Sequence, residues 1–136
     1  MNEKSWILIL THGNVGEAFV ESAEMIMGTL ANVQAFSLLP GMSPEEFIEM
    51  IKVKLDTLPK GVLVLTDLFG GTPFNAAIAL SGHYDINVVS GVNISMIIEG
   101  DLLRNDLSGR ELAEAVQQVG MKACCVADLP QQKNIK

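Results

Sequence analysis

The chain has 136 residues, of which 49% are hydrophobic and 18% are charged, and its formal net charge is −7. This length suits one domain with a hydrophobic core and leaves little room for a second. The negative charge argues against nucleic acid or an anionic membrane surface as the partner, and it is compatible with docking to a basic protein.

The start of the chain has no apolar run long enough for a signal peptide, and no apolar run in the sequence approaches the length of a membrane span. We therefore expect a cytoplasmic protein. Two adjacent cysteines, Cys124 and Cys125, lack the C-x-x-C spacing of a redox site. We expect them to be packing residues rather than reactive thiols.

The first part of the chain is typical of a strand, a helix and a second strand. Residues 6–10 are an apolar run, and apolar residues then recur at helical spacing until Gly28, a plausible stop. Residues 33–39 alternate but are less apolar, as expected for a strand near a sheet edge. The helical stripe consists of Val15, Ala18, Phe19, Ala23, Ile26 and Met27.

A second helix is predicted by the segment Ser43-Pro44-Glu45-Glu46, which has the residue types of a capping box with proline at the first helical position. Pro59-Lys60-Gly61 ends this helix. Residues 62–65 then run apolar on both faces, which is typical of a central parallel strand. The inward stripe of the helix is Phe47, Ile48, Ile51, Leu55 and Leu58.

A third helix is predicted to have Thr72 as its cap, Pro73 at its first position and Gly82 just past its end. Residues 86–89 predict a fourth strand. A further helix follows despite Gly100, which weakens it. Its apolar register is Ile94, Ile97, Ile98 and Leu102.

The last helix is predicted to begin at a second capping box, Ser108-Gly109-Arg110-Glu111, and to close at Gly120. A short strand over residues 123–127 should follow. We expect a domain over residues 1–128 and a polar, flexible tail over residues 129–136.

Strands that alternate with helices predict an α/β fold, a three-layer sandwich with a doubly wound and mostly parallel sheet. Ligands bind such sheets beyond the carboxyl ends of the strands, at the switch point of the topology. His12 follows the first strand and Asp67 follows the third. If those strands are neighbours, the order is 2-1-3-4 and both residues flank the crevice.

This pair can carry nucleophilic chemistry. A carboxylate that accepts the proton on one imidazole nitrogen leaves the other nitrogen free to attack, and it stabilises positive charge on the ring. Helix amino ends after Gly13 and around Gly71 and Thr72 would direct N–H groups at phosphoryl oxygens. No metal or cofactor is required. Taken singly, the histidine can be structural and the aspartate can cap a turn, so the joint placement carries the hypothesis.

Other site classes fit less well. Gly13 and Gly16 do not form G-x-G-x-x-G, and Gly70-Gly71-Thr72 lacks the lysine of a P-loop. The acidic pair of a receiver domain is missing from the end of the first strand. His83 follows the third helix and is expected to be a solvated residue without a catalytic role.

With these motifs in place, the chain resembles the EIIA domain of the mannose family of the bacterial phosphoenolpyruvate-dependent sugar phosphotransferase system. The resemblance spans nearly the whole chain. The segments that carry it are Thr11-His12-Gly13, Ala23-Glu24-Met25, Leu65-Thr66-Asp67, Gly70-Gly71-Thr72-Pro73-Phe74-Asn75-Ala76 and Gly91-Val92-Asn93-Ile94.

The resemblance implies that Nε2 of His12 accepts a phosphoryl group from the small carrier HPr and passes it to EIIB, with Asp67 bonded to the opposite nitrogen. The membrane subunits EIIC and EIID would be served indirectly. It also implies a homodimer that exchanges an antiparallel edge strand, matched by residues 123–127, with the cysteines packed at that interface. The alternatives are a phosphorylation-state sensor and the phosphocarrier subunit of a dihydroxyacetone kinase.

Overall fold

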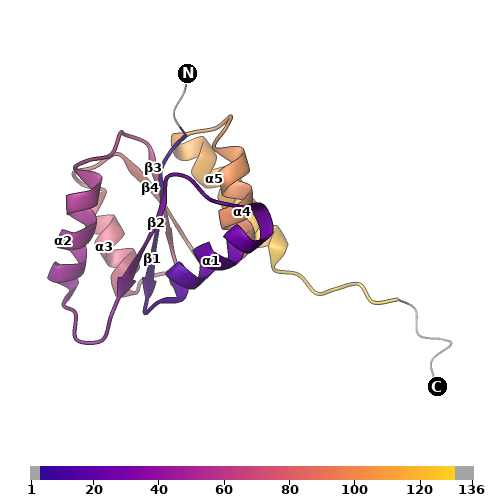
Figure 1. The fold of residues 1–136 in the computed structure, drawn as a ribbon, viewed down its shortest axis with the longest axis horizontal. Coiled ribbons are helices and arrows are strands. Elements are labelled where there is room, and N and C mark those ends of the chain that lie inside the picture. Colours follow the sequence, from indigo (N-terminus) through magenta and orange to yellow (C-terminus); the bar gives the residue numbers. More distant parts are fainter. Residues whose placement is uncertain (1–3, 131–136) are drawn as a thin grey trace.

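Four parallel strands form a sheet of order β2-β1-β3-β4, so the predicted α/β class and strand order are confirmed. The computed structural model describes residues 4–130 (Figure 1). Each strand is connected to the next one along the chain by a helix that crosses over the sheet, as parallel strands require. The strands are β1 (Ile7–His12), β2 (Val33–Leu38), β3 (Val62–Thr66) and β4 (Ile86–Ser90).

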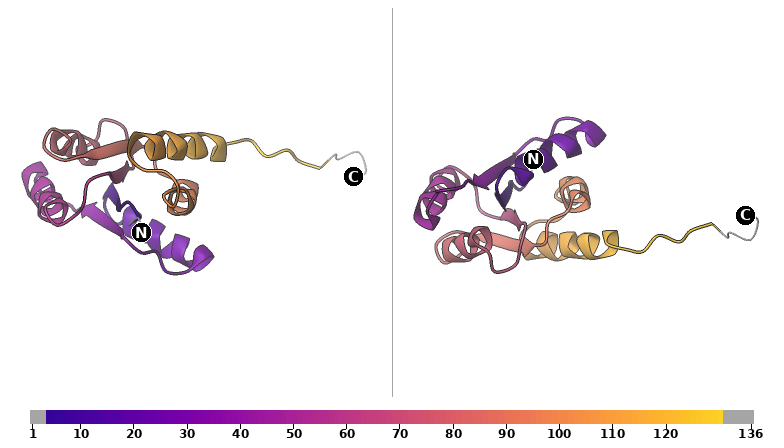
Figure 2. Two further views of the ribbon diagram at one scale, coloured as in Figure 1. Left: turned by 90° about the horizontal axis from the view of Figure 1, so that it is seen from above. Right: turned by 90° about the horizontal axis from the view of Figure 1, so that it is seen from below.

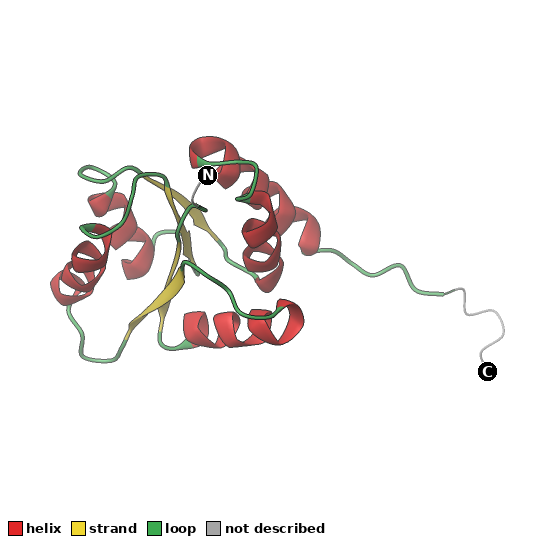
Figure 3. Cartoon of the chain, turned by 45° about the horizontal axis from the view of Figure 1, so that its top comes forward, coloured by secondary structure: helices red, strands yellow, loops and turns green. Residues whose placement is uncertain are grey.

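Helices cover both faces of the sheet and make three layers. Helices α1, α4 and α5 pack on one face, and α2 and α3 pack on the other (Figures 1 and 2). The strands lie between these two helical layers in Figure 3. The helices are α1 (Val15–Met27), α2 (Pro44–Leu55), α3 (Thr72–Leu80), α4 (Ile94–Leu103) and α5 (Gly109–Ala123). None of those in the described part of the chain has the length and apolarity to cross a membrane.

The two central strands are buried on both faces, which is why their sequences are apolar without alternation. Side chains along each strand still alternate between the layers. Ile7 and Ile9 belong to the core under α1, α4 and α5, whereas Leu8 and Leu10 belong to the core under α2 and α3. Continuing this alternation places Thr11 on the α1 face and His12 on the α3 face.

The helix beginnings agree only in part with the predicted caps. Ser43 and Glu46 form the expected capping box: the Glu46 amide donates to Ser43 Oγ and the Ser43 amide donates to Glu46 Oε1, both at 3.1 Å. The cap predicted at Thr72 is wrong, because Gly71 takes that position and Thr72 is the first helical residue. Ser108 is the N-cap of α5, but its side chain makes no capping bond.

The predicted end of α5 at Gly120 is also wrong, since the helix continues to Ala123. Gly120 serves helix packing: a Cβ there would lie 2.5 Å from Met96 Sδ, so any larger residue would require the Met96 side chain of α4 to move. The Gly120 carbonyl also accepts a bond from Asn93 Nδ2 at 3.2 Å. A glycine near a helix end therefore marks a contact here rather than a stop.

The strand predicted over residues 123–127 is not formed in this single chain. Residues 125–130 have no regular structure and extend away from the sheet (Figure 1). Cys124 and Cys125 are exposed, so they are not packing residues in the isolated subunit. A strand needs a neighbouring edge to pair with, and this segment reaches none within its own chain. Most of the predicted tail, residues 131–136, lies outside the described residues.

Helix α1 buries less of its predicted stripe than expected. Ala23 is buried, but Val15 and Ile26 are 44% and 65% exposed. The helix packs against β2 and α4 near a sheet edge, so it has neighbours on only one narrow side. The remaining apolar surface of α1 faces outward in the single subunit.

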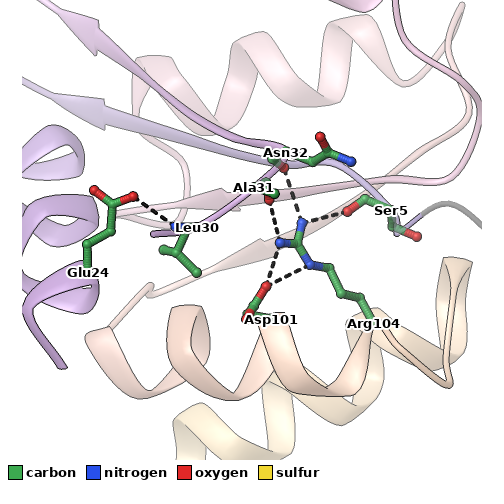
Figure 4. A network of polar contacts seen from close by, with 7 residues as sticks. All are labelled: Ser5, Glu24, Leu30, Ala31, Asn32, Asp101 and Arg104. Atoms are coloured by element: carbon green, nitrogen blue, oxygen red, sulfur yellow. Dashed lines mark hydrogen bonds and ion pairs between the residues drawn. The ribbon is translucent and has the colours of Figure 1, made fainter. Parts of the chain in front are cut away.

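Arg104, which had no role assigned from the sequence, binds the segments at the amino ends of β1 and β2, opposite to His12. It is 4% exposed, and its guanidinium donates to the carbonyl of Ser5 at 2.8 Å and to Asp101 Oδ1 at 3.1 and 2.5 Å. It also donates to the carbonyls of Ala31 and Asn32 at 2.5 and 3.2 Å. Figure 4 shows this one side chain joining α4 to the segments that lead into β1 and β2.

A second hydrogen bond in Figure 4 holds the segment between α1 and β2 at the end nearer to α1. Glu24 of α1 accepts from the Leu30 amide at 2.9 Å. The segment between α1 and β2 is thus fastened to two helices, and the edge strand β2 begins from a defined position.

Replacing Arg104 with methionine should lower the free energy of unfolding by about 2–4 kcal/mol, because buried carbonyls and the Asp101 carboxylate would lose their donor. Urea denaturation followed by circular dichroism measures the change. Arg110→Met is the control: Arg110 is 81% exposed and forms a surface pair with Glu114, so a change below about 0.5 kcal/mol is expected. Similar losses in the two variants would contradict the structural role of Arg104.

Candidate functional site at the carboxyl edge of the sheet

His12 lies at the end of β1, paired in register with Leu38 of β2. Its side chain is 48% exposed, in contrast to the buried residues before it on the strand. The strand therefore presents one imidazole at the carboxyl edge of the sheet, where solvent or a partner protein reaches it.

The carboxylate of Asp67 contacts this histidine, as the sequence predicted. Asp67 follows β3 directly, and β3 is the neighbour of β1 in the sheet. Its Oδ2 atom lies 3.0 Å from Nδ1 of His12 and also accepts the His12 backbone N–H at 2.9 Å. One oxygen thus holds both the ring and the main chain of a residue 55 positions away.

This contact assigns the tautomer of the neutral ring. An ionised carboxylate only accepts hydrogen bonds, so Nδ1 carries the proton and Nε2 keeps its lone pair. The other carboxylate oxygen, Asp67 Oδ1, is buried and has no partner among the described residues. The imidazole is therefore oriented through one nitrogen and free to react through the other.

Gly71 places the start of α3 against the free side of the ring. A Cβ on Gly71 would lie 2.8 Å from Cε1 and 3.4 Å from Nε2 of His12, so a side chain at this position would collide with the imidazole. Gly71 is the N-cap of α3, and Thr72 begins the helix. The first amides of a helix lack intrahelical acceptors and lie at its positive end, so this terminus suits an anion next to Nε2.

The segment before this terminus has a defined shape. Gly70 has φ +82°, a conformation that L side chains rarely adopt. Asn75 holds it from within α3, since its Nδ2 donates to the Gly70 carbonyl at 3.2 Å and its amide donates to the Gly71 carbonyl at 2.8 Å. Asn75 had no role assigned from the sequence, although it belongs to the glycine-rich segment.

Gly13 contributes differently from what was expected of it. It adopts φ +60°, and its N–H donates to the Leu38 carbonyl at 2.8 Å. That amide is engaged in the sheet and does not point to a ligand. Gly13 instead allows the sharp turn from β1 into α1, while Gly71 lies beside the imidazole.

Apolar side chains border the site on the β3 side. Leu68 is 58% exposed and Phe69 is 76% exposed, and both follow Asp67 directly. The Phe69 ring contacts Phe74 of α3, with centroids 4.7 Å apart. Exposed apolar residues beside a reactive group are typical of a surface that docks another protein.

The remaining candidates lie elsewhere or are missing. His83 follows α3 at its far end, next to Lys52 and Tyr84, and has no contact with His12. Within residues 4–130, no group of three or more histidine, cysteine or carboxylate side chains is placed to hold a metal ion.

The fold and site together define a doubly wound α/β domain with an exposed histidine held by a carboxylate at its switch point. Comparisons with known proteins give the family. A family model described as "PTS system fructose IIA component" (EIIA-man) matches residues 6–117. The chain therefore belongs to the EIIA-man family, which confirms the family resemblance identified from the sequence.

Individual relatives agree with this assignment. The mannose-specific EIIAB component of Escherichia coli (strain K12) is 42% identical over 106 residues, which cover 74% of this chain and 32% of that protein. The fructose-specific EIIA component of Bacillus subtilis (strain 168) is 31% identical over 87% of this chain and 85% of its own length. The chain thus spans about a third of the first relative and most of the second.

Solved structures show the same architecture. The mannose/sorbose specific IIA subunit from Enterococcus faecalis superimposes with a TM-score of 0.88 at 31% identity, covering 95% of this chain and 98% of that one. The EIIA component from Streptococcus agalactiae gives a TM-score of 0.82 at 34% identity, covering 90% and 95%. The fold of this chain is accordingly that of EIIA proteins.

Replacing Gly71 with alanine should displace the imidazole, because the added Cβ has no room beside Cε1. We expect carbethoxylation of His12 by diethyl pyrocarbonate to slow about tenfold or more, since small misplacements of a nucleophile are costly. Mass spectrometry of the peptides measures the rate at His12. Gly82→Ala is the control, because a Cβ there meets only Ala79 O at 3.5 Å. Unchanged reactivity in Gly71→Ala would contradict the close approach.

Proposed function

We propose that this protein is a phosphocarrier that accepts a phosphoryl group on Nε2 of His12 from phospho-HPr and passes it to an EIIB partner. The observation that carries the proposal is the contact of Asp67 with Nδ1, which leaves Nε2 free beside the amino end of α3. Membership of the EIIA-man family supports it.

The transfer is a displacement at phosphorus. The lone pair of Nε2 forms the new P–N bond while the bond from phosphorus to the donor protein breaks, and the reverse happens on the acceptor. In the phosphorylated state both ring nitrogens carry substituents, so the ring becomes cationic. The carboxylate of Asp67, already bonded to Nδ1–H, stabilises that charge. Amides at Gly71 and Thr72 would hold the phosphoryl oxygens.

The chain supplies one step of a longer relay. Membrane subunits EIIC and EIID would receive the phosphoryl group indirectly, through EIIB, and a cytoplasmic location follows from these partners. The sugar is chosen by those other subunits. Relatives are named for mannose, fructose and sorbose, so these are the candidate sugars for this system.

We also propose a homodimer in which residues 123–127 of one subunit pair with the free edge of β4 in the other. All five residues of β4 are only partly buried, and a groove along this strand is bordered by Phe69, Phe74 and α5. Val126 is 95% exposed and pairs with no strand among the described residues. An added strand would satisfy the edge of β4 and cover these apolar residues.

His12→Ala should abolish labelling by phosphoenolpyruvate, enzyme I and HPr, because the accepting nitrogen is gone. His83→Ala is the control and should label like the wild type, since His83 lies at the far end of α3. Radiolabel that is stable to alkali and lost in acid identifies phosphohistidine. Absence of label on the wild-type protein would refute the carrier function, whereas label that is never passed to EIIB would favour the sensor alternative.

Asp67→Asn should slow single-turnover phosphorylation by roughly tenfold to a hundredfold while the fold is kept, because the variant loses the charge that stabilises the cationic ring. Rapid-quench measurement of the label gives the rate. Asp106→Asn, an exposed change of the same kind far from the site, should have no effect. Equal rates for Asp67→Asn and the wild type would remove the orienting role of this carboxylate.

A further inference from the structure

The residue before His12 points into the opposite layer of the sandwich. Thr11 is fully buried, with an exposed fraction of 0%, and it faces α1. A buried hydroxyl at the end of an apolar strand is costly unless it is bonded. Its partners therefore show what it does.

The Thr11 hydroxyl forms two hydrogen bonds that close the turn from β1 into α1. It accepts the Gly16 amide at 3.1 Å and donates to the Gly13 carbonyl at 3.1 Å. The N-cap residue of α1, Asn14, makes no side-chain capping bond. Thr11 thus satisfies a donor in the first turn of α1 from five residues upstream, in place of the cap.

The packing of this turn leaves it little freedom. A Cβ on Gly16 would lie 3.1 Å from Thr11 Oγ1 and 3.2 Å from Thr11 Cγ2, so a side chain at this position of α1 would press on Thr11. On the other side, the Gly13 amide is fixed to Leu38 of β2. His12 lies between these two fixed points.

We propose that Thr11 is a positioning residue for the chemistry of His12, a role that rests on the proposed function. The His12 amide and its Nδ1 both bond to one oxygen of Asp67, so the peptide plane and the ring must be oriented together. The Thr11 hydroxyl sets the direction of the chain on the far side of His12. Without it, the turn relaxes, the amide rotates from Asp67 and the ring loses its fixed tautomer.

The test compares Thr11→Val, which keeps the shape and removes the hydroxyl, with Thr11→Ser, which keeps the hydroxyl. Long-range ¹H–¹⁵N correlation spectra report the tautomer of His12, and phosphoramidate, a small donor, reports the reactivity of Nε2 without any partner protein. Ser37→Ala is the matched control: it removes the buried hydroxyl opposite Thr11 in register, which bonds Glu17 instead of the turn.

We expect Thr11→Val to populate both tautomers and to react with phosphoramidate about tenfold to a hundredfold more slowly, with Thr11→Ser within about threefold of the wild type. Ser37→Ala should keep the wild-type tautomer and rate. A Thr11→Val protein with wild-type tautomer and rate would overturn the proposal. So would loss of the native circular dichroism spectrum in Thr11→Val, because the hydroxyl would then serve stability alone.

These outcomes are separate from those of the carrier function. A wild-type protein that reacts with phosphoramidate at His12 but takes no label from phospho-HPr would refute the relay, and the tautomer comparison would still decide the role of Thr11. A wild-type protein that accepts label from HPr, with Thr11→Val equally fast, would keep the relay and refute the positioning role.

Discussion

One oxygen atom of Asp67 fixes the position of His12 at the carboxyl end of the sheet, and the geometry of the site depends on this contact. It accepts two N–H groups from His12, one from the main chain and one from the ring, and so fixes a residue that is otherwise half exposed. An exposed imidazole on a strand end would rotate freely and exchange its tautomers. Bonding through Nδ1 leaves the lone pair of Nε2 free, and in the proposed transfer the same carboxylate would stabilise the positive charge of the phosphorylated ring.

The pairing of β1 with β3 brings His12 and Asp67 within hydrogen-bonding distance. Strands β1 and β3 are adjacent and parallel, so residues 55 positions apart end at the same edge. Because side chains alternate along β1, His12 and Thr11 point to opposite faces of the sheet. His12 lies against Gly71 at the start of α3, and Thr11 lies against Gly16 of α1. Two glycines allow two helices to approach the same strand end, one at each face. The site is thus built from close backbone contacts rather than from many polar side chains.

The amino and carboxyl ends of the strands are stabilised in different ways. At the amino end, opposite to the site, the buried guanidinium of Arg104 donates to three carbonyls and a carboxylate. The carboxyl edge keeps an exposed histidine bordered by Leu68 and Phe69. Among residues 4–130, no strand pairs with the outer edge of β4, and the segment after α5 has no regular structure. The buried polar network of Arg104 thus lies away from the surface that the proposed partners would reach.

The sequence by itself predicted the succession of strands and helices, the αβα class and the positions of His12 and Asp67 at strand ends, because apolar periodicity and strand-end position are local properties. That these two residues meet depended on β1 and β3 being neighbours, which the tertiary structure decided. Caps and helix ends were predicted less well: Thr72 follows the true cap, and Gly120 is a packing glycine. Only the tertiary structure decided the bonds of Arg104 and of Thr11. Those depend on which segments meet across layers, and no local pattern encodes that. Among the described residues the segment after α5 pairs with no strand, and a strand exists only beside another.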